Sequence, residues 1–377
     1  MKQYNVGIIG FGFIGKVHAY GYLNLPMYYN PVPLHAKITH ICTSRKETAE
    51  IGREMVGAQV AVIDFHEITE NPDIDIVHIC TPNHLHKEAL LSAIKHNKHI
   101  YCDKPLVTNM EEAEEIQEAM KEYNGTAQMT LQNRFFPATI RAKQLVEENF
   151  LGDVLEFRAS YLHSGSANPN APLKWKLSAE HGGGVIADLA SHVFDLIHYL
   201  IGDYQSLMAS THIAYAERPS AKDPSVKVKV DAEDCVMILA RMRSGALGSI
   251  EATKIATGVE DEVRFEIHGS RGALRFNGMD AHHLEAYDAT VADEPAGGMR
   301  GWTKIHTGQR YPAPPSGFPG PKFSIGWIRA HMACLANFLQ CIAEGSTGNP
   351  GLDQGIYIQH LIECARRSAN QNRWIDV

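Results

Sequence analysis

The sequence of 377 residues contains no uninterrupted apolar run of about 18 residues, the length that a membrane-spanning helix needs. It has no excess of basic residues, since the net charge is −8, and this argues against a nucleic-acid partner. Its seven cysteines are scattered and include no CxxC pair, which favours reduced thiols over disulfides. The first residues lead straight into a strand pattern, without the charged and apolar regions of a signal peptide. We therefore expect a cytoplasmic protein that acts neither on nucleic acid nor at a membrane.

The alternation of strands and helices changes once along the chain, and this change predicts two domains. Over residues 1–130 short apolar strands alternate with helical patterns, which predicts an α/β domain with a doubly wound parallel sheet. Over residues 131–377 long strands follow one another and end in two helices, which predicts an α+β domain with a large open, mostly antiparallel sheet. The expected strands are 205–217, 234–242, 246–256, 261–268 and 272–276, the helices are 325–344 and 353–371, and 290–323 is a proline-rich loop. An open sheet needs its far face covered, so we expect a homodimer or homotetramer through this sheet.

A glycine fingerprint opens the chain, directly after an expected strand over 5–9. The GxGxxG pattern consists of Gly10, Phe11, Gly12, Phe13, Ile14 and Gly15, and a helix through about Leu23 follows it. In this context the first glycine allows a tight turn, the second lets a pyrophosphate approach the backbone, and the third lets helix pack on strand. The fingerprint therefore predicts a Rossmann dinucleotide-binding domain. The proline-rich stretch 24–36 that comes next is expected to be irregular.

The choice between NAD and NADP depends on the residues after the second strand (37–42). An acidic residue there would hold the ribose 2′-hydroxyl of NAD, but the chain has Thr43, Ser44 and Arg45. Ser44 and Arg45 suit a 2′-phosphate, which favours NADP; the alternative is that Arg45 stacks on the adenine or points into solvent.

Two further turns at the expected carboxyl edge of the sheet carry polar side chains. The first, after strand 74–80, contains Thr81, Pro82, Asn83 and His86, of which Asn83 and His86 are expected to touch the ribose or nicotinamide; the alternative is that they cap helix 85–96. The histidines of this turn lack a third ligand at a suitable spacing, so we expect no metal site. The second turn is Asp103-Lys104-Pro105, after strand 99–102. Lys104 is a candidate catalytic group, although most lysines before a proline are solvated loop residues.

A second constellation follows a triple glycine at 182–184. Asp188, His192 and Asp195 share one face of an expected helix over 185–201, and a carboxylate one turn from a histidine suits a general base; the alternative is a helix with a satisfied polar face. Polar and aromatic residues nearby in the sequence suit a ligand with many hydroxyls, and these candidate substrate contacts are Asn133, Arg134, His163, Asn168 and Trp175.

Taken together, four motifs resemble the Gfo/Idh/MocA oxidoreductases, a family that includes glucose–fructose oxidoreductase and inositol dehydrogenase. They are Gly10–Gly15, Thr81–His86, Cys102–Leu106 and Gly183–His192. The stretch Tyr161–Trp175 further resembles the levoglucosan-oxidising members. The resemblance implies a Rossmann domain, an oligomer formed through the second domain, and a catalytic set of Lys104, Asp188 and His192. The residue Asp103 stands where the family usually has glutamate, and it joins Lys104 among the expected cofactor contacts.

These observations predict an enzyme, a nicotinamide-dependent dehydrogenase that acts on a secondary alcohol of a sugar, anhydrosugar or cyclitol, with His192 as the base. The cofactor is NAD or NADP, because levoglucosan-type relatives use NAD without the acidic residue. Two alternatives stay open: a glycosidase-type enzyme that oxidises its substrate transiently with a retained NAD, and a non-catalytic NAD(P)-binding regulator.

Overall fold

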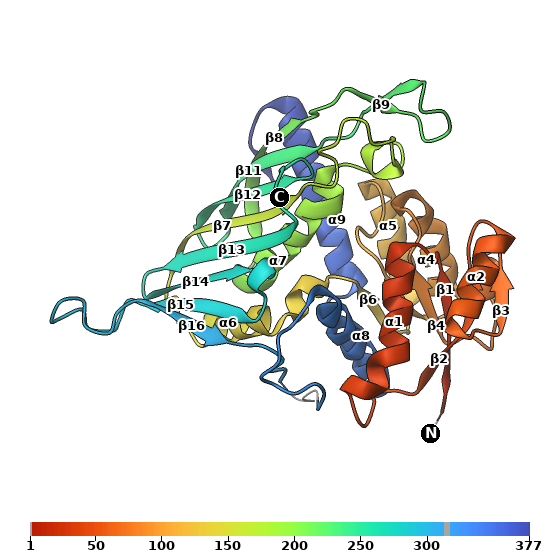
Figure 1. The fold of residues 1–377 in the computed structure, drawn as a ribbon, viewed down its shortest axis with the longest axis horizontal. Coiled ribbons are helices and arrows are strands. Elements are labelled where there is room, and N and C mark those ends of the chain that lie inside the picture. The colour runs from red at the N-terminus through yellow and green to blue at the C-terminus, as the bar shows by residue number, and fades with distance from the viewer. Residues whose placement is uncertain (1, 313–316) are drawn as a thin grey trace. The chain divides into compact units, whose positions relative to one another are not determined.

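The computed structural model describes residues 2–312 and 317–377, and packing divides the chain into two units (Figure 1). The first unit contains the chain through Phe135 and segments 311–321 and 327–359, whereas the second contains 136–310, 322–326 and 360–377. A single boundary at residue 130 was predicted from the sequence. The division by packing differs from it, because segments late in the chain belong to the first unit. No helix among the described residues is both long and apolar enough to span a membrane.

The first unit is built on a six-stranded parallel sheet with the order β3-β2-β1-β4-β5-β6. Its strands are β1 (Tyr4–Ile9), β2 (Ala36–Cys42), β3 (Val60–Val62), β4 (Ile76–Ile79), β5 (His99–Cys102) and β6 (Ala127–Met129). Its helices are α1 (Phe13–Tyr28), α2 (Lys46–Val56), α3 (His66–Thr69), α4 (His86–Lys95), α5 (Met110–Ala119) and α8 (Trp327–Glu344). The strand order reverses between β1 and β4, the place where open α/β sheets bind ligands outside the carboxyl ends of their strands. The predicted doubly wound sheet is confirmed.

Helix α8 packs into the core of the first unit although about 200 residues separate it from β6. Its buried Cys334, Leu335 and Phe338 belong to one apolar cluster with Val6 and Ile8 of β1. The amide of Gln128 on β6 donates to the Cys334 carbonyl at 2.9 Å. Apolar periodicity predicts such a helix, but it does not say which sheet the helix covers.

The second unit contains a nine-stranded sheet with the order β16-β15-β14-β13-β7-β12-β11-β8-β17, in which only β7 and β12 run parallel. Its strands are β7 (Val154–His163), β8 (Tyr204–His212), β11 (Cys235–Met242), β12 (Leu247–Thr253), β13 (Asp261–Gly269), β14 (Gly272–Asn277), β15 (His283–Asp288), β16 (Trp302–His306) and β17 (Ile375–Asp376). A separate ribbon pairs β9 (Glu217–Pro219) with β10 (Lys227–Lys229). The helices α6 (Pro137–Glu147) and α7 (Ser191–Ile201) lie on one face of the sheet (Figure 1). The open, mostly antiparallel sheet is as predicted.

Four predicted elements differ locally from the structure. Helix α1 continues past Pro26 to Tyr28, where an irregular stretch was expected, because Leu25 and Tyr29 are buried in the core of the first unit. The expected strand 205–217 ends at His212. The expected loop 290–323 contains β16, and its residues 313–316 lie outside the described part. The expected helix 185–201 begins as a π-helical turn (Ile186–Ala190). Helix α9 (Leu352–Gln371), by contrast, agrees with the expected helix 353–371 to within one residue.

Candidate functional site

The glycine loop between β1 and α1 has the shape that a dinucleotide phosphate needs. Gly10 has φ of +92°, and a Cβ there would lie 2.6 Å from the Cys80 carbonyl oxygen. A Cβ on Gly15 would meet the Gly10 carbonyl, so α1 approaches β1 too closely for any side chain. At Gly12, by contrast, a Cβ would find no heavy atom within 4 Å. Open space therefore lies beside the backbone at the start of α1, where free N–H groups favour an anion.

The three apolar residues of the loop have different surroundings. Phe11 lies against α2, where a Cβ on Gly52 would come within 2.8 Å of its ring, and Ile14 packs against the same core. Phe13 is 74% exposed, and its ring centroid lies 5.6 Å from that of Trp327 in α8. Phe11 and Ile14 thus shape the loop through packing, while Phe13 is available to a ligand.

The turn after β2 leaves Ser44 and Arg45 exposed. The hydroxyl of Thr43 donates to the Arg45 carbonyl at 2.8 Å, which holds this turn at the start of α2. An exposed arginine beside an exposed hydroxyl at this edge of the sheet is the arrangement that the sequence predicted for the adenosine end of the cofactor.

The turn after β4 corrects the role predicted for one residue, His86. Its ring is fully buried, with Nε2 2.9 Å from the Thr81 carbonyl oxygen and Nδ1 3.1 Å from that of Pro105. Both ring nitrogens are therefore used to join the Thr81 turn to the Lys104 turn, and the side chain is not presented to a cofactor. Asn83, 6% exposed, starts a short 3-10 helix after Pro82 and remains a candidate contact.

Lys104 lies two residues beyond β5, at the carboxyl edge of the sheet, as predicted. The Asp103 amide donates to the Ile79 carbonyl at 2.9 Å and so continues the pairing of β5 with β4. Lys104 itself is partly exposed, while Pro105 and Leu106 are buried.

The two cysteines at the ends of β4 and β5 are not candidate nucleophiles. Burial, together with the charge of Asp103, raises the pKa of the Cys80 and Cys102 thiols, so neither thiol is ionised near neutral pH.

A histidine that sequence reasoning missed lies near this lysine. His331 on α8 is 5% exposed, and neither of its ring nitrogens has a hydrogen-bond partner among the described residues. Burial first, and then the charges of His18 and Lys104, hold the pKa of His331 well below its usual range. Its ring centroid lies 4.2 Å from that of Trp327, one turn earlier. Only the packing of α8 reveals this pair, because about 220 residues separate it from Lys104 in the sequence.

In the second unit, the triple glycine brings a lysine loop next to Asp188. The Gly183 and Gly184 amides donate to the carbonyls of Ser178 and Lys176 at 2.9 and 3.0 Å. A Cβ on Gly183 would lie 2.7 Å from the Lys176 carbonyl, so the two segments lie too close for a side chain there. Arg366 on α9 donates to the Gly183 carbonyl at 3.0 Å and holds the segment from the other side.

Asp188 forms ion pairs with two lysines that the sequence analysis did not single out. Its Oδ1 accepts from Lys176 Nζ at 2.9 Å, and its Oδ2 lies 3.2 Å from Lys254 Nζ. The side chain of Lys254, at the end of β12, is 7% exposed, whereas that of Lys176 is 49% exposed. The sequence analysis placed Lys254 inside an expected strand over 246–256, and only the structure ends β12 at Thr253, directly before this lysine.

His192 lies one turn beyond Asp188, at the start of α7, and is 5% exposed. Its ring centroid is 5.6 Å from that of Tyr161 on β7. Burial, followed by the charges of Asp261 and Asp188, raises the pKa of Tyr161 well above its usual value, so this phenol stays protonated. Asp195 is 1% exposed. The π-helical turn 186–190 adds a residue to the turn that carries Asp188, and such turns occur frequently at functional sites.

The five candidate substrate contacts divide between the two units. Asn133 and Arg134, 3% and 8% exposed, lie on the 3-10 turn Gln132–Phe135 of the first unit, and the buried Nδ2 of Asn133 has no hydrogen-bond partner among the described residues. In the second unit, His163 Nδ1 accepts from the Gly165 amide at 2.7 Å and Asn168 Oδ1 accepts from the Asn170 amide at 2.9 Å. These two side chains stabilise their own turns. Trp175 is partly exposed, with Lys176 Nζ 5.8 Å from its ring centroid.

Comparison with known proteins matches the two parts of the chain to two domains of one family. Residues 4–131 match the model described as "Oxidoreductase family, NAD-binding Rossmann fold", and residues 143–377 match "Oxidoreductase family, C-terminal alpha/beta domain" of the same family, Gfo/Idh/MocA.

Two relatives have named activities. Levoglucosan dehydrogenase from Pseudarthrobacter phenanthrenivorans is 33% identical over 390 residues, which cover 100% of this chain and 99% of that protein. Myo-inositol 2-dehydrogenase from Thermotoga maritima is 28% identical over 269 residues, covering 71% and 74%. A solved structure of levoglucosan dehydrogenase in complex with NADH and levoglucosan superposes with a TM-score of 0.94 at 34% identity, covering 100% of this chain and 99% of that one.

Proposed function

The chain belongs to the Gfo/Idh/MocA family of oxidoreductases, and from this premise we propose that it oxidises a ring secondary alcohol of an anhydrosugar such as levoglucosan. Its general activity is the nicotinamide-dependent oxidoreduction of a sugar or cyclitol alcohol. The anhydrosugar is favoured because the levoglucosan dehydrogenase relative matches the full length of the chain. The observation that carries the proposal is that the open space at Gly12 and the side chain of Lys104 occur at the same carboxyl edge of one sheet.

The residues of the glycine loop fit a dinucleotide, because the space at Gly12 is what a pyrophosphate would fill. The start of α1 would hold the phosphates, Asn83 the ribose or nicotinamide, and Ser44 with Arg45 the adenosine end. When bound, the nicotinamide supplies the hydride acceptor. The buried, unpartnered amide of Asn133 suits a substrate hydroxyl, which can accept its hydrogen bond.

In the proposed reaction His192 accepts the proton of the substrate hydroxyl while the carbon-bound hydrogen leaves as hydride. Lys104 donates a hydrogen bond to the same oxygen and stabilises the negative charge that develops on it. Asp188, ion-paired with Lys176 and Lys254, orients the sugar through a neighbouring hydroxyl. Its carboxylate therefore acts as an acceptor, and His192 is left as the base.

The decisive experiment is a panel of anhydrosugars, sugars and cyclitols, assayed with NAD and with NADP in parallel by the absorbance of the reduced cofactor. We expect levoglucosan to give the highest kcat/KM. Replacement of Lys104 by alanine should lower kcat by roughly a hundredfold or more while the Kd for the reduced cofactor stays unchanged. Unchanged turnover in this variant would contradict the role of Lys104. Consumption of a glycoside without net formation of reduced cofactor would instead indicate the transient-oxidation reaction.

The identity of the cofactor has its own test at Arg45. If this guanidinium contacts a 2′-phosphate, Arg45→Ala should raise KM for NADP by about tenfold and leave KM for NAD unchanged. If Arg45→Ala changes both KM values equally, or changes neither, Arg45 does not contact the 2′-position. That outcome would favour NAD, the cofactor whose reduced form the solved relative contains.

We also propose that the open sheet face of the second unit forms a homo-oligomer interface. Four apolar side chains on neighbouring strands are 36–50% exposed: Met208, Met237, Leu239 and Leu247. Leu239 is paired in register with Met208, so at least these two form one patch. Such a patch on a soluble protein marks an interaction site. Light scattering on the wild type and on Leu239→Lys tests this, since a monomeric wild type would overturn it.

A further inference from the structure

A cluster of metal-ligating side chains lies at the turn between β14 and β15 of the second unit. Oδ1 of Asp280 is 3.0 Å from Nε2 of His282 and 2.7 Å from Nδ1 of His283. One ligand atom from each of the three side chains lies within 4.8 Å of the others. All three residues belong to the second unit, so their mutual geometry is set within one packed body.

The surrounding backbone fixes this turn before any ligand binds. Asn277 accepts from the Met279 amide at 2.8 Å and starts the short 3-10 helix that ends at Asp280. The His282 carbonyl accepts from the amides of Thr307 and Gly308 at 2.9 and 3.1 Å. The two segments that hold the cluster are therefore tied to each other by main-chain hydrogen bonds.

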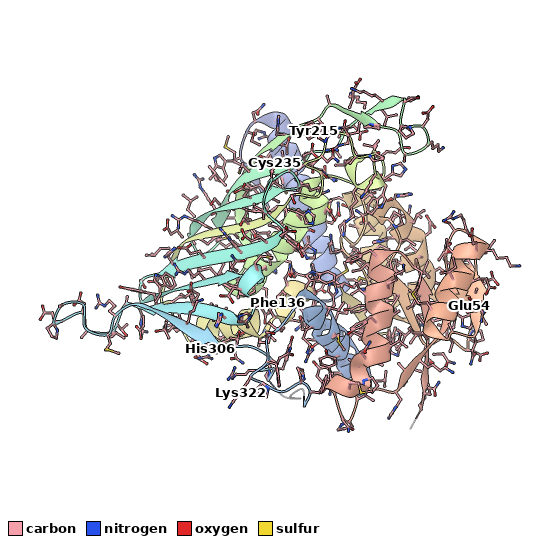
Figure 2. All side chains as sticks on the ribbon, in the orientation of Figure 1. Glu54, Phe136, Tyr215, Cys235, His306 and Lys322 are labelled. Carbon is pink, nitrogen blue, oxygen red and sulfur yellow. The ribbon has the colours of Figure 1, made fainter. Side chains whose placement is uncertain are left out.

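A third histidine orients the cluster from the neighbouring strand. His306 on β16, labelled in Figure 2, is the register partner of His283, and its Nδ1 lies 3.1 Å from Nε2 of His283. This contact uses the nitrogen of His283 that faces away from Asp280. Metal-binding histidines commonly have such a partner on their second nitrogen, which fixes the ring orientation and the tautomer.

We propose that Asp280, His282 and His283 bind one divalent transition-metal ion of the Zn²⁺ class. Zinc bonds of about 2.0–2.1 Å in tetrahedral geometry place ligand atoms roughly 3.3 Å apart. The two separations from Asp280, 2.7 and 3.0 Å, are about 0.3–0.6 Å shorter than this, and the two histidine nitrogens lie within 4.8 Å of one another, so small side-chain rotations would form the site. Two imidazole nitrogens and one carboxylate select a transition metal over Mg²⁺ or Ca²⁺, which prefer oxygen ligands.

Charge and access are compatible with an ion at this place. The carboxylate of Asp280 contacts both histidines and also Lys304. Lys304 Nζ contacts Oδ2, at 3.2 Å, and so leaves Oδ1 for the histidines. Asp280 and His283 also line a cavity of about 560 Å³, and the Asp280 and His282 side chains are each 40% exposed. An ion can therefore enter from solvent, and water can complete its coordination.

These residues differ from the histidines of the turn after β4, for which the sequence predicted no metal site. At that turn His86 uses both ring nitrogens on main-chain carbonyls and is not available as a ligand. The residues 280–283 were not singled out, because the pattern Asp-x-His-His carries no metal signature and its partner His306 lies 23 residues further on.

The test is calorimetric titration of ZnCl₂ into the chelator-treated full chain at pH 7.5. We expect one equivalent to bind the wild type and to raise its melting temperature. The variants His283→Ala and Asp280→Asn should each weaken this binding by about a hundredfold, and His306→Ala by about tenfold.

His268→Ala is the matched control, because this histidine lies on the same sheet but pairs with Glu266. The control should bind zinc like the wild type. All of these variants should keep the wild-type melting temperature in chelator and the wild-type dehydrogenase rate, so failure of the metal site is distinguishable from failure of the proposed function. The proposal is overturned if the wild type binds no zinc, or if binding survives unchanged in His283→Ala.

Discussion

Replacing Lys254 by methionine removes a buried ammonium from Asp188 while keeping most of the side chain's volume. The Lys254 side chain is 7% exposed and the Asp188 side chain 15%, and their charged atoms lie 3.2 Å apart. Lys176 holds the other carboxylate oxygen at 2.9 Å, but its side chain is 49% exposed. The two lysines therefore pair with the same carboxylate but differ strongly in burial.

The expected magnitudes follow from this difference. At an effective dielectric constant of about 20, two charges 3.2 Å apart attract by about 5 kcal/mol, before the cost of desolvating them is subtracted. Removing one partner of a buried pair costs about 3–5 kcal/mol, and the remaining Lys176 reduces this to roughly 2–3 kcal/mol for Lys254→Met. Exposed pairs contribute about 0–1 kcal/mol, so Lys176→Met should cost less than about 1 kcal/mol.

Thermal unfolding of the two variants and the wild type measures the difference. With a shift of about 2–4 °C per kcal/mol, Lys254→Met should melt roughly 5–10 °C below the wild type, and Lys176→Met within about 3 °C of it. The double variant should lose more than the sum of the two, because Asp188 then lacks both ion-pair partners. Equal melting temperatures for the two single variants, or a larger loss in Lys176→Met, would refute the reasoning from burial.

Three other predictions concern the first unit. Gly12→Ala should melt at the wild-type temperature but bind the reduced cofactor at least about tenfold more weakly, as fluorescence titration would show. Gly15→Ala should lower the melting temperature even without cofactor, because its Cβ would collide with the Gly10 carbonyl. His86→Ala should lower the free energy of unfolding by about 2–4 kcal/mol and reduce kcat, while the affinity for the cofactor stays unchanged. A loss of cofactor affinity without a loss of stability would instead support the direct contact between His86 and the cofactor that the sequence predicted. Burial lowers the pKa of His18 to about 3, so the unfolded chain binds the additional proton between pH 6.5 and 3, and stability falls as the pH is lowered through that window. Denaturant titrations at pH 7 and pH 5 should show a loss of about 2 kcal/mol from this residue, and His18→Gln should show a smaller loss over the same interval.

The features that could be predicted from sequence are those in which neighbouring residues carry the whole signal. The glycine fingerprint, the strand 99–102 that ends before Lys104, and the paired strands 261–268 and 272–276 of the second unit were all predicted within one residue of the positions where the structure has them. Each depends on backbone freedom or on apolar alternation over a few residues, so no distant contact is needed to specify it. The family resemblance extended these local signals to Asp188 and His192.

The partners of the candidate residues could not be predicted in this way. The sequence placed Asp188 one turn from His192, but it gave no sign that the carboxylate lies between Lys176 and Lys254, 12 residues before it and 66 after it. For His86 the sequence showed an imidazole at a sheet edge, and only the folded chain shows that both nitrogens are used by main-chain carbonyls.

By itself, then, the sequence determined the fold class, the phosphate loop and the place of Lys104, because local backbone geometry and apolar periodicity specify them. Tertiary structure alone decided that α8 packs on the first sheet, which brings His331 close enough for the charge of Lys104 to help lower its pKa. It alone also placed His306 beside the Asp280 cluster, through the register of β15 with β16. The physical reason is the same in both cases: packing and strand pairing select partners by shape and hydrogen bonding across long sequence separations, which a local pattern does not encode.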